Sequence, residues 1–309
     1  MDPISVTNLV KTYNWKGRIT EALRGVTFSV KKGEIFGLLG PNGAGKSTTT
    51  HVLAGMLHRD AGDVRILGQD VEQNSEVRQR MNIASAYLGM SDLLSVDENL
   101  RVYAALYRVK NPEEQLTLLL KRFELIPLRK AVFRSLSSGE RTRVLLCKGL
   151  INNPEVLLLD ECTVGLDPDV AQLTRDIIQE YQNDHGTTIL FTSHYMQEVE
   201  QLCNRIAFLS EGKIILTDTA KALKKRIGEQ VVDIELHKPA DLKAFFAERD
   251  IAVLSQHGAR YTLELSTADE TLYKMLNTLF QQGHKIKDLQ IHPPTLDHVF
   301  IKIARGEMR

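Results

Sequence analysis

The chain has 309 residues, of which 39 are basic and 39 acidic, so its formal net charge is zero. This balance argues against a nucleic-acid partner held by bulk electrostatic attraction. Hydrophobic residues make up 43% and charged residues 25%, which lets a packed core form without disulfides or metal. Cys147, Cys162 and Cys203 stand far apart with no CxxC spacing, which predicts reduced thiols in a cytosolic protein.

The N-terminal residues show no basic stretch followed by an apolar one, so we expect no signal peptide. The richest apolar runs, near Ile35–Leu39 and Val156–Leu159, are far shorter than the roughly 18 residues that span a bilayer. They have the length of buried strands. We therefore expect a soluble chain, with any membrane function left to a partner.

The first elements are predicted to be strands. Ile4–Val10 and Gly25–Val30 alternate apolar and polar residues, and Glu34–Leu39 is a short apolar run. Gly40–Gly45 is a glycine-rich turn, and a helix is expected over Lys46–Leu57.

The middle of the chain alternates helices and strands. From about Asp92 to Arg134 apolar residues recur every three or four positions, which indicates helix. Ser135–Gly139 interrupts this pattern before a helix over Glu140–Ile151. The remaining elements expected here are strands Val156–Asp160, Thr187–Ser193 and Ile206–Leu209, with a helix over Val170–Asn183. This alternation predicts an α/β fold with a parallel sheet.

The C-terminal part begins with a basic and polar stretch, Lys221–Glu229, which we interpret as a linker. The elements expected after it are Val231–Leu236, helix Ala240–Glu248, Ile251–Leu254, Arg260–Leu265, helix Glu270–Gln282, Lys285–Ile291 and a last helix after Pro294. The order βαββαβ predicts a small ferredoxin-like, α+β domain. We place two domains at residues 1–225, with a helical subdomain at about 88–150, and at residues 230–309.

A phosphate-binding loop is the first motif that carries chemistry. Residues 40–47 fit the pattern GxxxxGK[ST] between a predicted strand and a predicted helix. Backbone N–H groups and the helix N-terminus attract phosphate there. Lys46 would reach the β- and γ-phosphates, and Ser47 would ligate Mg²⁺. The predicted nucleotide contacts are Gly40, Pro41, Asn42, Gly43, Ala44, Gly45, Lys46, Ser47 and Thr48.

Two carboxylates end the apolar strand Val156–Leu159. Asp160, delivered beside the phosphate loop, would be a second partner of Mg²⁺. Glu161 follows it and is a candidate general base for the attacking water.

Between and after these motifs lie three segments that resemble the ATP-binding subunits of ATP-binding cassette (ABC) transporters. Leu136–Glu140 reads LSSGE and is similar to the family signature LSGGQ. Gly165–Asp167 is similar to its D-loop, and His194 ends a predicted strand as its switch histidine does. Four elements stand in the family's order from Gly40 to His194, and the resemblance covers about residues 4–225. It implies a phosphate-loop NTPase cassette with a helical subdomain that binds ATP and Mg²⁺.

The resemblance implies roles for several residues. Ser137 and Gly139 would bind the γ-phosphate of a nucleotide held by the opposite subunit, and His194 would hold Glu161 and the water in line. Asp167 would lie at the dimer interface. An aromatic residue would stack on adenine: Tyr13 is favoured, and Trp15 is the alternative because Asn14–Thr20 looks like an insertion.

The chain also departs from the family pattern. Ser138 and Glu140 replace a glycine and a glutamine of the signature, and Cys162 stands in place of a proline, where we expect an inert buried thiol. Ala86 takes the place of the glutamine that senses Mg²⁺ and the permease.

The ending Pro294–Phe300 resembles bacterial cassettes that serve drug, antibiotic and polysaccharide exporters. The resemblance implies ATPase activity, an integral membrane permease as partner, and a head-to-tail dimer with a second copy or a homologous cassette. It places the chain in the cytoplasm, peripheral on the inner face of the cell membrane. A soluble non-transport ATPase of the same family and a non-hydrolysing regulatory subunit remain alternatives.

Overall fold

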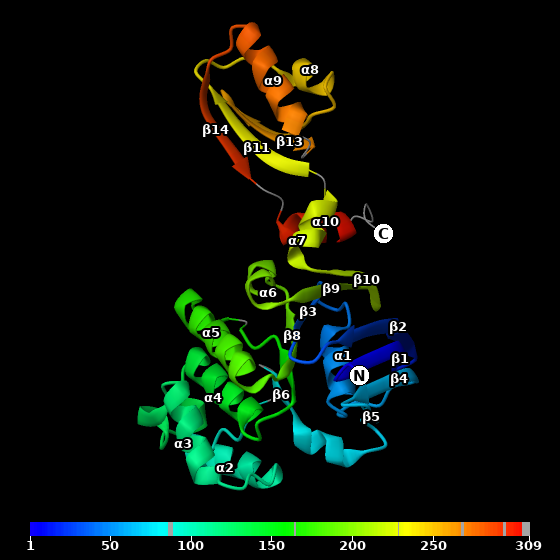
Figure 1. The fold of residues 1–309 in the computed structure, drawn as a ribbon, viewed down its shortest axis with the longest axis vertical. Coiled ribbons are helices and arrows are strands. Elements are labelled where there is room, and N and C mark those ends of the chain that lie inside the picture. Colours follow the sequence, from blue (N-terminus) through cyan, green and yellow to red (C-terminus); the bar gives the residue numbers. More distant parts are fainter. Residues whose placement is uncertain (86–88, 164, 228, 267–268, 293–294, 305–309) are drawn as a thin grey trace. The chain divides into compact units, whose positions relative to one another are not determined.

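The computed structural model describes residues 1–85, 89–163, 165–227, 229–266, 269–292 and 295–304. It divides into two compact units, Met1–Thr219 and Ala220–Met308, which are coloured blue to green and yellow to red in Figure 1. Among the described residues, the first unit contains two sheets and the second unit one, and each unit has its own hydrophobic core.

The first unit begins with an antiparallel sheet in the order β2-β1-β4-β5. Its strands are β1 (Ile4–Trp15), β2 (Arg18–Val30), β4 (Ala61–Ile66) and β5 (Gln69–Asp70). The hairpin of β1 and β2 closes at Lys16 and Gly17, which both have positive φ, the conformation that two-residue hairpin turns require. The strands expected to end at Val10 and to begin at Gly25 are therefore much longer, and residues 14–20 form the tip of this hairpin.

A second, six-stranded sheet has the order β10-β9-β3-β8-β7-β6. Its strands are β3 (Ile35–Leu39), β6 (Met81–Ser85), β7 (Val156–Asp160), β8 (Thr188–Ser193), β9 (Arg205–Ser210) and β10 (Lys213–Asp218). All neighbouring strands are parallel except β10, which runs antiparallel to β9 at the edge. The predicted parallel α/β sheet is confirmed.

Helices connect and cover these strands, and α2, α3 and α4 lie grouped together with α5 beside α4 in Figure 1. The helices are α1 (Lys46–Leu53), α2 (Val96–Leu106), α3 (Pro112–Arg122), α4 (Ser138–Leu150), α5 (Pro168–His185) and α6 (Met196–Leu202). Short 3₁₀ turns are η1 (Ser75–Arg80), η2 (Ile126–Leu128) and η3 (Phe133–Ser135). No helix within the described ranges is long and apolar enough to cross a bilayer.

One hydrophobic core joins the two sheets of the first unit. Val6 and Val30 of the antiparallel sheet lie in the same buried cluster as Leu38, Leu158 and Leu190 of the parallel sheet. Strands β3, β7 and β8 are buried along their whole length, which explains why they are continuous apolar runs and not alternating ones. The rigid centre of this sheet positions the residues at its ends.

The second unit has a four-stranded antiparallel sheet in the order β12-β13-β11-β14. Its elements are α7 (Ala220–Ile227), β11 (Glu229–Leu236), α8 (Lys243–Ala247), β12 (Ala252–His257), β13 (Arg260–Ser266), α9 (Asp269–Gln281), β14 (Ile286–His292) and α10 (Leu296–Ala304). From β11 to β14 the order is βαββαβ, and the first and third strands are central. The predicted ferredoxin-like arrangement is confirmed.

The linker expected over Lys221–Glu229 is wrong. Residues 220–227 form helix α7, which packs against α10 within the second unit. Leu223 of α7 is fully buried, as are Leu296 and Val299 of α10. The stretch reads as polar because α7 contributes few apolar side chains to this contact.

Candidate functional site

Three buried strands end side by side at one edge of the parallel sheet. Leu39 at the end of β3 pairs with Ser193 at the end of β8, and Thr192 pairs with Asp160 at the end of β7. Ligand sites of open α/β sheets lie at this carboxyl edge. The phosphate-loop residues, the carboxylate pair and the switch histidine all follow directly from these three strands.

The phosphate loop joins β3 to α1 and approaches its surroundings closely. A Cβ on Gly40 would lie 2.2 Å from the carbonyl oxygen of Leu209, so no larger residue fits. Gly45 has φ +110°, a conformation that L side chains rarely adopt. Lys46 folds back over the loop, and its Nζ donates to the carbonyl oxygens of Gly40 (2.8 Å) and Pro41 (3.3 Å). The loop therefore holds an ammonium group in its centre.

Asp160 is fully buried and faces the start of α1. Ser47 Oγ donates to its Oδ1 at 3.4 Å, and Thr192 Oγ1 donates to the same oxygen at 2.7 Å. Ser85 Oγ, at the end of β6, donates to Oδ2 at 3.5 Å. The two residues predicted to hold Mg²⁺, Ser47 and Asp160, are in contact.

A magnesium ion fits this donor set chemically. Mg²⁺ prefers hard oxygen donors and is commonly held by one or two carboxylates together with substrate phosphates. Ser47 and Asp160 offer a hydroxyl and a carboxylate beside the phosphate loop. A cluster of three or more His, Cys, Asp or Glu that could hold a metal by itself does not occur among the described residues.

Glu161 has a strained backbone. Its φ is +51°, a region that costs a non-glycine residue on the order of 1–3 kcal/mol. Its N–H donates to Thr192 O (3.2 Å) and to Thr192 Oγ1 (3.1 Å), which holds the conformation. The carboxylate is consequently directed at the site, with Oε1 at 3.2 Å from Lys46 Nζ. Strain of this kind concentrates at functional sites.

His194 follows β8 and lies beside Glu161. Its Nδ1 is 3.5 Å from Glu161 Oε2, which is too long for a well-formed hydrogen bond. That nitrogen is buried and makes no hydrogen bond with any described residue. Lys46, Asp160, Glu161 and His194, which lie up to 148 positions apart in the sequence, are thus brought together.

The predicted adenine-stacking residue lies beside α1, the helix that follows the phosphate loop. Tyr13 Oη is 3.4 Å from Thr48 Oγ1, in the first turn of α1. Trp15 is at the hairpin tip, where 75% of its surface is exposed and its ring lies under Lys16. The geometry favours Tyr13 over Trp15 for a contact near the loop.

The signature segment starts helix α4. Ser137 is its N-cap, and Glu140 completes a capping box: Ser137 N donates to the Glu140 carboxylate at 2.7 Å, and Glu140 N donates to Ser137 Oγ at 3.3 Å. The backbone hydrogen bond from Ser137 lowers the pKa of Glu140. A Cβ on Gly139 would lie 3.2 Å from Val170 Cγ1, so α5 passes close to this turn. Among the described contacts, none joins Ser137 or Gly139 to Lys46 or to the residues around it (Asp160, Glu161 and His194).

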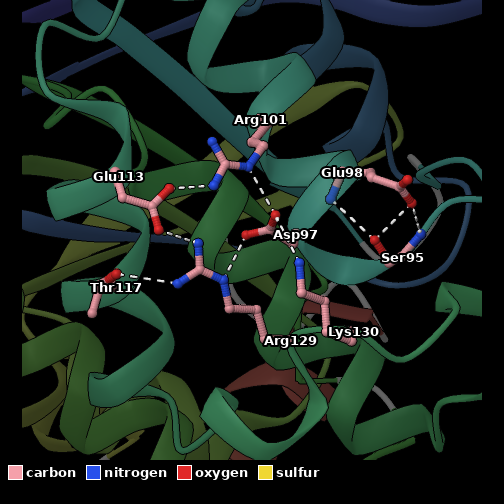
Figure 2. Close-up of polar contacts among 8 residues, drawn as sticks. All are labelled: Ser95, Asp97, Glu98, Arg101, Glu113, Thr117, Arg129 and Lys130. Carbon is pink, nitrogen blue, oxygen red and sulfur yellow. Dashed lines mark hydrogen bonds and ion pairs between the residues drawn. The ribbon is translucent and has the colours of Figure 1, made fainter.

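An ion-pair network holds the segment that precedes the signature (Figure 2). The buried carboxylate of Asp97, in α2, accepts from Arg101 Nε (2.8 Å) and Arg129 Nε (2.6 Å), and Glu113 of α3 pairs with both arginines. Burial alone would raise the pKa of Asp97, but the hydrogen bonds from the two arginines outweigh it and lower that pKa. The segment that precedes Ser137 is thereby tied to α2 and α3.

Two further predictions concern single residues. Cys162 is buried, and burial raises the pKa of its thiol, as expected for an inert group. Ala86 lies outside the described residues.

Sequence reasoning missed the roles of Thr192 and Glu198. The Thr192 hydroxyl and carbonyl connect Asp160 to Glu161, and Glu198 binds three neighbouring segments. Neither residue belongs to a spaced motif. Their partners become neighbours only when β7 and β8 pair, so a single sequence offers no signal for them.

Two family models match the chain. Residues 23–164 match the model described as "ABC transporter". Residues 219–304 match the model described as "ATP-binding protein DrrA1-3-like, C-terminal domain". Together they cover parts of both structural units.

Relatives match over almost the whole chain. The daunorubicin resistance ATP-binding protein DrrA3 of Streptomyces coeruleorubidus is 32% identical over 99% of this chain and 97% of its own length. The linearmycin resistance ATP-binding protein LnrL of Bacillus subtilis is 30% identical over 99% of both. The Nod factor export ATP-binding protein I of Burkholderia orbicola is 36% identical over 99% of this chain and 98% of its own length.

Solved structures agree with this match. An ATP-binding subunit of an ABC transporter superposes with a TM-score of 0.65 and 25% identity, covering 73% of this chain and 93% of the other. A dimeric bacterial ABC transporter cassette, with a TM-score of 0.64 and 24% identity, has the same fold over 70% of this chain and 98% of its own. The chain therefore belongs to the ABC transporter family and is one of its ATP-binding subunits, with the ATPase activity of that family.

Proposed function

We propose that this ATPase drives export of a substrate through a separate integral membrane permease. Relatives that match over nearly their full length carry names that refer to daunorubicin resistance, linearmycin resistance and Nod factor export. The third name states export, and export of a compound would account for resistance to it, so all three names support export. A separate permease is part of the proposal because ATP-binding subunits of ABC exporters pair with membrane permeases.

The phosphate loop and Tyr13 would bind the nucleotide. Backbone N–H groups of residues 42–48 and the N-terminus of α1 attract the phosphates, and the Lys46 ammonium lies beside the same loop. Ser47 and Asp160 would hold Mg²⁺, which neutralises phosphate charge when it is bound. Tyr13 would stack on adenine, since its hydroxyl lies beside Thr48.

Hydrolysis would proceed by in-line attack of water on the γ-phosphorus. Glu161 accepts a proton from the water while the water oxygen forms a bond to the γ-phosphorus. The bond from that phosphorus to the β–γ bridging oxygen breaks, giving ADP and phosphate. His194 lies against the Glu161 carboxylate and would hold the γ-phosphate and the water in line. The catalytic contribution comes from positioning and charge stabilisation.

The second half of the site would come from another subunit. Ser137 and Gly139 start a helix, where N–H groups attract phosphate, yet no described contact joins them to Lys46. We infer that they close on the nucleotide of the opposite chain in a head-to-tail dimer, with Asp167, the N-cap of α5, at the interface.

The observation that carries the proposal is the convergence of Lys46, Asp160, Glu161 and His194 on one sheet edge. Affinity purification of the tagged chain from its own membranes tests it. We expect an integral membrane protein to be retained and phosphate to be released from ATP, with release lost in Glu161→Gln. Retention of no membrane protein would contradict the role in transport, and full activity of Glu161→Gln would contradict the proposed base.

A further inference from the structure

A buried carboxylate next to the site binds three separate segments of the chain. Glu198 lies in α6, four residues after His194, and only 8% of its surface is exposed. Its Oε2 accepts from Thr163 Oγ1 at 2.6 Å and from Ser193 Oγ at 3.0 Å, and its Oε1 accepts from Arg175 Nη1 at 3.2 Å. We call these four residues (Thr163, Arg175, Ser193 and Glu198) the Glu198 clasp.

The clasp holds both candidate catalytic side chains by their neighbours in the chain. Thr163 comes two residues after Glu161, and Ser193 directly precedes His194. Ser193 Oγ also accepts from Tyr195 N at 3.0 Å, which fixes the backbone on both sides of the histidine. The segments that carry Glu161 and His194 are thus both hydrogen-bonded to the Glu198 carboxylate. This shared contact determines the distance of 3.5 Å between the two side chains.

Arg175 connects the clasp to α5, the helix that follows the D-loop segment. It lies in α5, which begins after Asp167, and its side chain and that of Glu198 are 13% and 10% exposed. Arg175 Nη2 also donates to Gln172 Oε1 at 2.8 Å. Because the pair is largely removed from water, loss of the carboxylate would leave a poorly solvated guanidinium and weaken the attachment of α5 to α6.

The phosphate loop is outside the clasp. Lys46 contacts the carbonyl groups of its own loop and Glu161. Among the described residues, the hydrogen bonds of Glu198 go to Thr163, Arg175 and Ser193 and not to residues 40–48. Loss of a contact in the clasp should consequently change the positions of Glu161 and His194, while nucleotide binding is retained.

We propose that Glu198 is a positioning residue for ATP hydrolysis. Its carboxylate sets Glu161, His194 and α5 relative to one another, so that it acts through these residues. The inference rests on the proposed roles of Glu161 and His194. A purely structural role would lower the stability of the chain and its ATP affinity together, whereas positioning lowers kcat alone.

The test compares Glu198→Gln with the parent in the full chain. Glutamine keeps the shape but removes the charge that pairs with Arg175. We expect kcat for phosphate release to fall at least tenfold, while KM and the Kd for a fluorescent ATP analogue change less than twofold. Glu198→Asp should recover part of kcat. The matched control is Glu180→Gln, which removes an exposed carboxylate that pairs with Arg122 and should leave kcat unchanged.

A second pair of variants decides the matter if Glu198→Gln does not fold. Thr163→Val has nearly the same shape but lacks the hydroxyl, and Thr163→Ser keeps it, so the first should lower kcat and the second should restore it at constant KM. Parent kcat in Glu198→Gln or in Thr163→Val, or equal losses of kcat and ATP affinity, would overturn the inference. If Glu161→Gln hydrolyses ATP at the parent rate, the proposed function itself fails, and that result is independent of the clasp variants.

Discussion

Lys46 Nζ lies 3.2 Å from Glu161 Oε1, and both side chains are buried. The group that would bind phosphate and the group that would activate water thus neutralise each other across the site. ATP phosphates offer the ammonium stronger acceptors than the loop carbonyls that it contacts. Nucleotide binding is therefore expected to draw Lys46 away from the carboxylate and to leave Glu161 available to the water.

Substitution of Tyr13 should weaken ATP binding more than substitution of Trp15. Stacking of an aromatic side chain on a base contributes about 1–3 kcal/mol, so Tyr13→Ala should raise the Kd for ATP about tenfold, and Tyr13→Phe should retain the affinity. Trp15→Ala should change it less than twofold because the ring is exposed at the hairpin tip. Equilibrium titration with a fluorescent ATP analogue measures both. A larger effect of Trp15→Ala would transfer the stacking role to that residue.

Replacement of Glu140 by glutamine should favour dimer formation. The amide keeps the capping box, but it removes a negative charge next to Ser137, where the γ-phosphate of the opposite nucleotide is proposed to bind. The lowered pKa of Glu140 means that this carboxylate stays charged at neutral pH. In a Glu161→Gln background, the ATP concentration that gives half-maximal dimer should fall about threefold.

Light scattering at increasing ATP concentration gives this midpoint. Glu124→Gln is the control, since its carboxylate is exposed in the same helical region and pairs with Arg143 at 3.8 Å. An unchanged or higher midpoint for Glu140→Gln would show that Ser137 is not near the phosphate in the dimer.

Asp97→Asn should destabilise the chain in a pH-dependent manner. The pKa of Asp97 is lowered in the folded state, so its contribution is fully present above the unfolded value near 3.8 and is lost as pH falls through the lower folded value. Loss of charged hydrogen bonds to Arg101 and Arg129 should cost about 2 kcal/mol at pH 7. Urea unfolding of both proteins should show this difference shrinking toward pH 3.

Asp63→Asn is the matched control for this comparison. Asp63 pairs with Arg65 where both side chains are about half exposed, and such pairs contribute less than about 1 kcal/mol. A destabilisation by Asp97→Asn that stays constant between pH 7 and pH 3 would mean that shape, and not charge, accounts for the effect.

Most residues of the candidate site could be predicted from the sequence, but the residues that hold them in place could not. The pattern GxxxxGK[ST] predicts the phosphate loop, and the end of an apolar strand predicts Asp160 and Glu161, whereas only the resemblance to the ABC family points to His194. The structure brings these residues to one sheet edge because each lies at the end of a strand that is buried along its length. The hairpin at residues 14–20 was underestimated because its strands leave the core and carry exposed polar residues.

Long-range contacts account for the remaining errors. Helix α7 resembles a linker in the sequence because it is short and basic, and its packing against α10 is a long-range contact. Glu198 was not recognised because its partners Thr163, Arg175 and Ser193 come from three segments. Periodicity and motifs report the elements, whereas such contacts depend on the order of strands in the sheet.

The most direct test of the account is the molar mass of Glu161→Gln with Mg²⁺ and ATP, measured by light scattering. The substitution keeps the shape of the base but cannot accept the proton, so the cycle should stop with both nucleotides bound between two chains. We predict a shift from 34.8 kDa to the mass of a dimer with ATP, no shift with ADP, and none for Lys46→Ala with either nucleotide. Two results together would contradict the two-chain site: the variant alone keeps the mass of one chain at saturating ATP, and its complex with the permease contains one copy of the chain.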